Sequence, residues 1–236
     1  MNVDKIVKKF AEKLANLKFS NPTYYCYNPL DYASKPAKSY CDKYGKGKKE
    51  VLLLGMNPGP FGMAQTGVPF GDITLVRDWL GIEEKVGKPE LEHPKRPIDG
   101  FNCKRSEVSG QRLWGWAKKR YQTSEKFFSR YFVWNYCPLC FMEEGGKNRT
   151  PDKLSAVERG QLFPICDWAL TEVIKELNPK FLVGVGKFAE DRFSALEIAE
   201  NKIVGRILHP SPASPLANAG WDKAMEKQLI ELGVKL

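Results

Sequence analysis

Four short apolar runs, widely spaced along the chain, predict buried β-strands. They cover residues 51–54, 131–134, 181–185 and 203–208. Continuous apolar runs of this length are typical of strands that are covered on both faces of a parallel sheet.

Between these runs, apolar residues recur every three to four positions, which predicts helices. The predicted helices cover about 107–121, 153–177, 187–199 and 221–232. Residues 1–20 predict a further amphipathic helix that ends near Asn21-Pro22, because apolar residues recur there at helical spacing between lysines. Strands that alternate with helices indicate an α/β sandwich with a mostly parallel central sheet. We expect one domain over residues 1–236.

Two segments have little periodicity. Residues 21–49 are rich in Tyr, Pro, Lys and Gly and are predicted to be irregular. Residues 83–105 are charged and contain prolines, which predicts a long surface loop with His93 at the surface.

The chain of 236 residues has a formal net charge of +9, and six of these charges are the excess within residues 1–50. Positive excess favours polyanions such as nucleic acid. A solvated lysine-rich face gives the same composition, so charge alone does not decide between these interpretations. With 42% hydrophobic residues, the chain is expected to be globular rather than disordered.

The sequence contains no signal of export or of membrane insertion. The first 20 residues lack the apolar core of a signal peptide, and no apolar run approaches the roughly 20 residues that cross a bilayer. We therefore expect no membrane association, a cytoplasmic location in a bacterium or a nuclear one in a eukaryote, and reduced thiols without disulfides. Cys137 and Cys140 form one CxxC pair, which without a second pair is weak support for a metal, so no cofactor is expected.

Polar residues follow three of the predicted strands. Asn57, Asn135 and His209 each come just after an apolar run. Because ligands of open parallel sheets bind at the carboxyl ends of the strands, we expect these side chains to converge on one crevice. The glycine-rich segment 55–72 begins there too, but it matches neither of the common phosphate-binding patterns, GxxxxGK[ST] and GxGxxG.

Each of these side chains also has a simpler interpretation. The amides of Asn57 and Asn135 match the edge of a pyrimidine, yet asparagines after strands also cap turns and helices. Phe70 is suited to stacking on a base or to packing in the core. His209 is one of two histidines and is either structural or catalytic. The residues alone leave these alternatives open.

Three motifs together resemble one family. GMNPGPFGMAQTGVPFGD at 55–72, WNYCPL at 134–139 and HPSPASPLANAGW at 209–221 are similar to the single-strand-selective monofunctional uracil-DNA glycosylases. The resemblance covers most of the chain and implies a three-layer α/β/α sandwich. It also implies that the protein flips uracil out of DNA and hydrolyses its glycosidic bond, leaving an abasic site in base excision repair.

The resemblance implies two catalytic residues. Asn57 positions the attacking water, and His209 stabilises negative charge that develops on uracil O2 as the base departs. Since asparagine is a poor proton acceptor, a dissociative reaction with late addition of water is expected.

The resemblance also implies a base-binding set, which consists of Met56, Gly59, Met63, Phe70 and Asn135. A backbone N–H of the loop 56–63 shares the charge on O2, and Asn135 contacts N3–H and O4. Phe70 stacks on the ring. Gly59 leaves room, or a water, beside C5, which implies that 5-substituted uracils such as 5-hydroxymethyluracil are also substrates.

The loop after His209 is expected to contact the DNA. Its implied DNA-binding residues are Pro210, Ser211, Pro212, Ala213, Ser214 and Leu216. The family commonly has HPSPRNP with an arginine that enters the duplex, and Ala213 stands in its place here. Leu216 is a candidate apolar wedge. We expect activity on duplexes, relative to single strands, to be weaker than in arginine-bearing relatives.

Three further expectations follow. The partner is uracil-containing DNA, single- or double-stranded, and deaminated purines are possible additional substrates. The protein is expected to be a monomer. The alternatives are a DNA-binding module with a vestigial pocket and an iron–sulfur glycosylase of a related branch.

Overall fold

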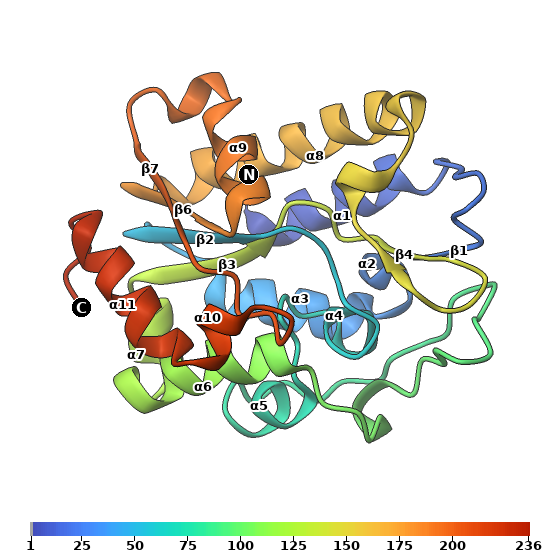
Figure 1. Cartoon of the computed structure of the whole chain (residues 1–236), viewed down its shortest axis with the longest axis horizontal. Coiled ribbons are helices and arrows are strands. Elements are labelled where there is room, and N and C mark those ends of the chain that lie inside the picture. The colour runs from blue at the N-terminus through green and yellow to red at the C-terminus, as the bar shows by residue number, and fades with distance from the viewer. Residues whose placement is uncertain (1) are drawn as a thin grey trace.

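The computed structural model describes residues 2–236 and is built around a four-stranded parallel sheet. Its strands are β2 (Val51–Gly55), β3 (Tyr131–Asn135), β6 (Phe181–Val185) and β7 (Ile203–Ile207). They lie in the order β3-β2-β6-β7 (Figure 1). All three pairings are parallel, so the carboxyl ends of the four strands meet at one edge. The four predicted strands are confirmed.

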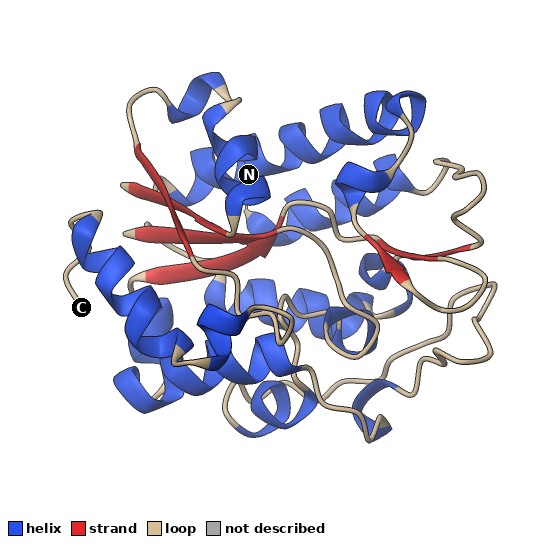
Figure 2. Ribbon diagram, in the orientation of Figure 1, coloured by secondary structure: helices blue, strands red, loops and turns tan. Residues whose placement is uncertain are grey.

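Helices cover both faces of this sheet, in the α/β/α arrangement that the resemblance implied (Figure 2). The helices are α1 (Val3–Leu14), α2 (Pro29–Tyr32), α3 (Ser34–Tyr44), α4 (Met63–Thr66), α5 (Ile73–Asp78), α6 (Val108–Tyr121), α7 (Ser124–Phe128), α8 (Ala156–Leu177), α9 (Lys187–Ser194), α10 (Pro215–Asn218) and α11 (Trp221–Glu231), with 3₁₀ turns at Gly100–Asn102, Pro151–Lys153 and Glu197–Ala199. Figure 1 shows α8 and α9 above the sheet and α6, α7, α10 and α11 below it. The helices predicted between the strands are confirmed, with shorter ends.

The prediction for the N-terminal helix is wrong at its C-terminal end. The helix α1 stops at Leu14 rather than near Asn21-Pro22. Beyond it, the backbone N–H and the hydroxyl of Ser20 both donate to the carboxylate of Glu158, at 2.8 and 3.1 Å. This anchor to the start of α8 holds the segment in a non-helical course, although Leu17 still packs against the core.

The prediction that residues 21–49 are irregular is wrong. They contain α2, α3 and the strand β1 (Tyr25–Tyr27). This strand joins β4 (Cys140–Met142) and β5 (Asn148–Arg149) in a small antiparallel sheet. A three-residue strand whose partner lies more than 100 residues away leaves no local pattern to detect.

His93 is buried, which contradicts the expectation that it lies at the surface. Its Nδ1 accepts from the backbone N–H of Lys95, and its Nε2 lies 2.9 Å from the carbonyl oxygen of Glu144, to which it donates. The ring also packs against Tyr25, with centroids 4.6 Å apart. The histidine therefore ties the long loop 83–105 to the small antiparallel sheet.

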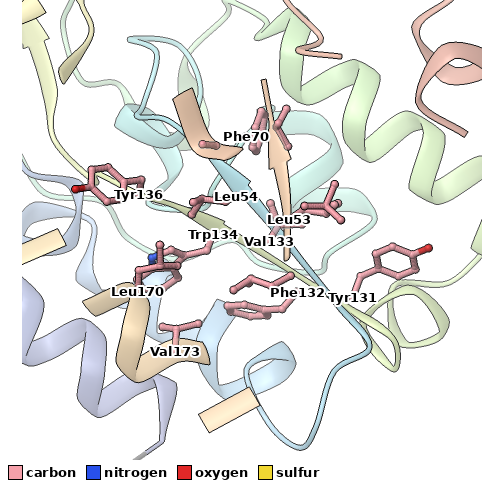
Figure 3. Close-up of a cluster of buried hydrophobic side chains, with 14 of the residues drawn as sticks. Leu53, Leu54, Phe70, Tyr131, Phe132, Val133, Trp134, Tyr136, Leu170 and Val173 are labelled. Atoms are coloured by element: carbon pink, nitrogen blue, oxygen red, sulfur yellow. The ribbon is translucent and has the colours of Figure 1, made fainter. Parts of the chain in front are cut away.

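A continuous apolar core fixes the sheet under the edge where the strands end. Figure 3 shows Leu53, Leu54, Val133 and Trp134 from β2 and β3 close to one another. These strand residues are buried, as are Leu170 and Val173 of α8. Among residues 2–236, no helix is both long and apolar enough to cross a membrane.

Candidate active site

A cavity of about 300 Å³ opens at the carboxyl edge of the sheet. Its wall contains eight of the residues that the sequence singled out, namely Met56, Asn57, Gly59, Met63, Phe70, Asn135, His209 and Ser211. They come from the end of β3 and from the segments that follow β2 and β7, which lie far apart in sequence. The structure thus brings the expected side chains together, while their individual roles stay predictions.

Gly55, the last residue of β2, makes room for two of these side chains. It pairs with Asn135 across the sheet. A Cβ atom on Gly55 would lie 2.3 Å from Oδ1 of Asn135 and 2.7 Å from the ring of Phe70. Both distances are too short for a real contact, so the amide and the aromatic ring take these positions because residue 55 is glycine.

Phe70 has a backbone conformation that phenylalanine rarely adopts, with φ of +52°. Its carbonyl oxygen accepts from the N–H of Asp72 at 2.7 Å. The side chain is 7% exposed and faces the same cavity as His209, whose ring centroid lies 6.5 Å away. Unfavourable backbone geometry of this kind is typical of residues whose position serves a site.

Asn57 is held by backbone carbonyls. Its Nδ2 donates to the carbonyl oxygens of Leu139 at 3.3 Å, Arg149 at 3.4 Å and Pro58 at 3.3 Å. Because these partners are all acceptors, they place the amide nitrogen on their side. The other end of the amide, Oδ1, is left as the acceptor that a molecule in the cavity can use.

Asn135 ends β3 and is 5% exposed. Its Nδ2 lies 3.2 Å from the sulfur of Met63, a weak acceptor. The amide therefore keeps most of its hydrogen-bonding capacity while it lines the cavity.

His209 follows β7 and is held by its neighbours. The carbonyl of Leu208 accepts from Nε1 of Trp221 at 2.6 Å, and the N–H of Leu208 donates to Gln228 at 2.7 Å. Gly186 has φ of +94°, and a Cβ there would stand 3.4 Å from the Cβ of His209. Burial lowers the pKa of His209, which favours the neutral imidazole at pH 7.

The loop after His209, residues 210–216, is held by hydrogen bonds at its start and exposed to solvent at its tip. Arg112 of α6 donates to the carbonyls of Pro210 and Ser211, at 3.2 Å each. Five of the predicted loop residues lie outside the cavity wall, and these are Pro210, Pro212, Ala213, Ser214 and Leu216. Leu216, in the short helix α10, is 71% exposed.

The cavity wall also contains residues that sequence reasoning missed. They are Pro58, Glu107, Ser109, Asn148 and Thr150. Pro58 sits inside the first motif, so that motif could have revealed it. Glu107 and Ser109 come from the start of α6, and Asn148 and Thr150 come from β5 and the residue after it. No local sequence pattern indicates how these elements dock against β2.

Within residues 2–236, no group of three or more His, Cys, Asp or Glu side chains is arranged to hold a metal ion. Cys137 and Cys140 are buried free thiols, and the other four cysteines are also free. Burial raises the pKa of Cys140 to about 12, so this thiol is protonated at pH 7.

Comparison with known proteins places these features in one family. The model of the uracil DNA glycosylase superfamily matches residues 42–231. A single-strand selective monofunctional uracil-DNA glycosylase of Rattus norvegicus is 49% identical over 224 residues, covering 94% of this chain and 81% of the relative. A protein of the same description from Bos taurus is 47% identical and covers 94% of this chain and 83% of the relative.

A solved structure shares the fold. The crystal structure of wild-type SMUG2 of Pedobacter heparinus aligns with a TM-score of 0.67, covering 99% of this chain and 97% of that one. The two sequences are 18% identical, so this likeness concerns the fold alone.

Proposed function

The chain belongs to the single-strand selective monofunctional uracil-DNA glycosylases, within the uracil-DNA glycosylase superfamily, and on this premise we propose what it does. It hydrolyses the N-glycosidic bond of deoxyuridine in DNA, releases uracil and leaves an abasic site for base excision repair. The observation that carries the proposal is the single cavity in which Asn57, Asn135, Phe70 and His209 meet.

The cavity receives a base that has been flipped out of the strand. Asn135 accepts from N3–H through Oδ1 and donates to O4 through Nδ2. Phe70 stacks on the ring. Flipping costs a few kcal/mol, least in single strands. The net charge of +9 attracts the phosphate backbone and helps to offset that cost.

Bond cleavage depends on stabilising the departing base. As the glycosidic bond breaks, negative charge grows on uracil O2, and the neutral imidazole of His209 donates a hydrogen bond to it. A backbone N–H of the loop 56–63 shares this charge. Burial of the imidazole strengthens the interaction because little water screens it.

Water completes the reaction at the sugar. Asn57 holds the water through Oδ1, since the two N–H groups of Nδ2 are already shared among three carbonyls. An amide does not remove a proton efficiently, so the water adds late, to a sugar that has already become cation-like. An abasic site results without strand cleavage.

The substrate range extends beyond uracil in this proposal. Gly59 has no side chain at the cavity wall, and a Cβ there would have its nearest neighbour 3.7 Å away. This leaves space for a small group on C5, as in 5-hydroxymethyluracil. Deaminated purines are a further candidate class.

DNA is bound by a monomer through the loop 210–216, with Leu216 as the side chain that enters the stack.

Release of free base tests the proposal. The protein is incubated in EDTA with a single-stranded oligonucleotide that carries one deoxyuridine, and the product is analysed with and without alkali. We expect free uracil and a strand that breaks only after alkali. Tight DNA binding without release of uracil would contradict the proposal and favour a binding module.

A further inference from the structure

Glu107 is a cavity residue to which the mechanism above gives no task. It immediately precedes α6, at the position where a helix is usually capped by Ser, Thr, Asp or Asn. Its side chain makes no capping hydrogen bond with the described residues and instead lines the cavity.

The carboxyl group of Glu107 is shielded and short of partners. Its Oε2 is buried and has no hydrogen-bond partner among residues 2–236. Burial raises the pKa of this carboxyl to about 7, and nearby Asp72 adds to the shift. The nearby backbone N–H of Gly110 lowers this pKa to a smaller extent. It forms no hydrogen bond to Oε2. Such a group is costly in the unbound protein and becomes favourable when a ligand supplies the missing partner.

The surrounding chain leaves space for this carboxyl. A Cβ on Gly62 would lie 2.8 Å from the Glu107 carboxyl carbon, and a Cβ on Gly110 would lie 2.6 Å from Oε2. Two glycines, one from the first motif and one from α6, therefore make room for it. A Cβ on Gly59 would lie 3.7 Å from Oε1, so the carboxyl belongs to the same stretch of wall as Gly59.

We propose that Glu107 is a specificity-determining residue that accepts a hydrogen bond from a hydroxyl carried on C5 of the bound pyrimidine. The inference rests on the proposed function, which puts O2 at His209 and the C5 edge beside Gly59. C2 and C5 are opposite corners of the ring, so the C5 substituent points away from the imidazole and toward this wall.

Chemistry favours a hydroxyl over the alternatives. A hydroxymethyl group on C5 donates to the carboxyl oxygen whether the acid is ionised or neutral. A methyl group fills the same space and offers no hydrogen bond, which leaves Oε2 without a partner. Plain uracil leaves room for a water beside the carboxyl.

Relative rates on two substrates test the inference. We would measure kcat/KM for single-stranded oligonucleotides that carry deoxyuridine or 5-hydroxymethyldeoxyuridine, with wild type, Glu107→Leu and Glu107→Gln. The matched control is Glu200→Gln, which removes an exposed carboxylate outside the cavity wall. In Glu107→Leu, the rate on the hydroxymethyl substrate should fall about 10- to 100-fold relative to that on deoxyuridine. Glu107→Gln, whose amide oxygen still accepts, should retain most of the ratio.

The outcomes separate this inference from the proposed function. If the ratio of the two rates is unchanged in Glu107→Leu, the specificity role is overturned. If both rates also fall by the same factor, Glu107 has a structural role. Wild type that releases uracil but no 5-hydroxymethyluracil also overturns this inference and leaves the proposed function intact. Wild type that releases neither base overturns both. Glu107→Met, with an unbranched apolar side chain, replaces Glu107→Leu if the latter does not fold.

Discussion

The cavity wall and the loop 210–216 lie next to each other and differ in construction. Cavity residues such as Phe70 and Asn135 are buried, and they pack so closely against Gly55 of the sheet that no Cβ atom would fit there. The loop is held at its start by Arg112, whereas Ala213 and Leu216 at its tip are exposed. Changes at the proposed catalytic residues of the wall should therefore affect chemistry on every substrate, and changes at the tip should affect only how the strand is opened.

The largest effect is expected at the two proposed catalytic side chains. Asn57→Ala and His209→Ala should each lower single-turnover release of uracil by on the order of 10²-fold or more, because each removes a group that acts in the transition state. DNA affinity should change little. Rapid-quench kinetics with excess enzyme measures the rate, and Asn201→Ala, an exposed asparagine outside the cavity wall, is the control. Rates near wild type in both variants would refute the assigned roles.

A smaller loss is expected when the wall is displaced without removing a functional group. Gly55→Ala puts a Cβ 2.3 Å from Oδ1 of Asn135 and must move that amide or Phe70. Overpacking of this kind costs about 1–3 kcal/mol of unfolding free energy, and we expect uracil release to fall about tenfold or more. Gly160→Ala in α8 is the control, since a Cβ there meets no atom within 4 Å. Chemical denaturation and base release should separate the two variants, and equal behaviour would contradict the role of Gly55.

The cavity wall could be predicted largely from the sequence, because the topology of a parallel sheet brings distant strand ends together. Parallel strands end at one edge, so Asn57, Asn135 and His209 could be brought together from the apolar runs that precede them. Glu107 could not, because its place in the wall depends on how α6 docks against the first motif. The burial of His93 could not be predicted for a similar reason, since its partner, the carbonyl of Glu144, lies 51 residues away.

The same limit applies to the small antiparallel sheet. The strand β1 has three residues and a partner more than 100 residues distant, so its pairing depends on tertiary contacts rather than on local pattern. The sheet nevertheless contributes to the site, because the carbonyl of Arg149 in β5 holds the amide of Asn57.

Stability should depend on pH through Glu107. Its pKa is raised by burial from 4.5 to about 7, so ionisation disfavours the folded state. This destabilisation is absent below the unfolded pKa of 4.5, grows as the pH rises toward 7 and is constant above that. Glu107→Gln should therefore be more stable than wild type at pH 8 by about 3 kcal/mol, with little difference at pH 4.5. Urea denaturation at both pH values measures this, and a difference independent of pH would contradict it.

The smallest effects are expected at the loop tip, and only on duplexes. Leu216→Ala should lower uracil release from duplex relative to single-stranded DNA by a few-fold, because the apolar wedge is lost. Ala213→Arg should raise the same ratio by restoring a side chain long enough to enter the stack. Val157→Ala in α8 is the matched control, since Val157 is 72% exposed. Equal changes on both kinds of DNA would place the loop among the general binding residues instead.

A crystal structure of Asn57→Ala with a single-stranded oligonucleotide that carries deoxyuridine tests the central claim most directly. The account predicts an extruded uracil in the cavity, with its ring on Phe70, its O2 within hydrogen-bonding distance of His209, and its N3–H and O4 at Asn135. A uracil that remains outside the cavity, or that lies in it with O2 directed away from His209, would contradict the account.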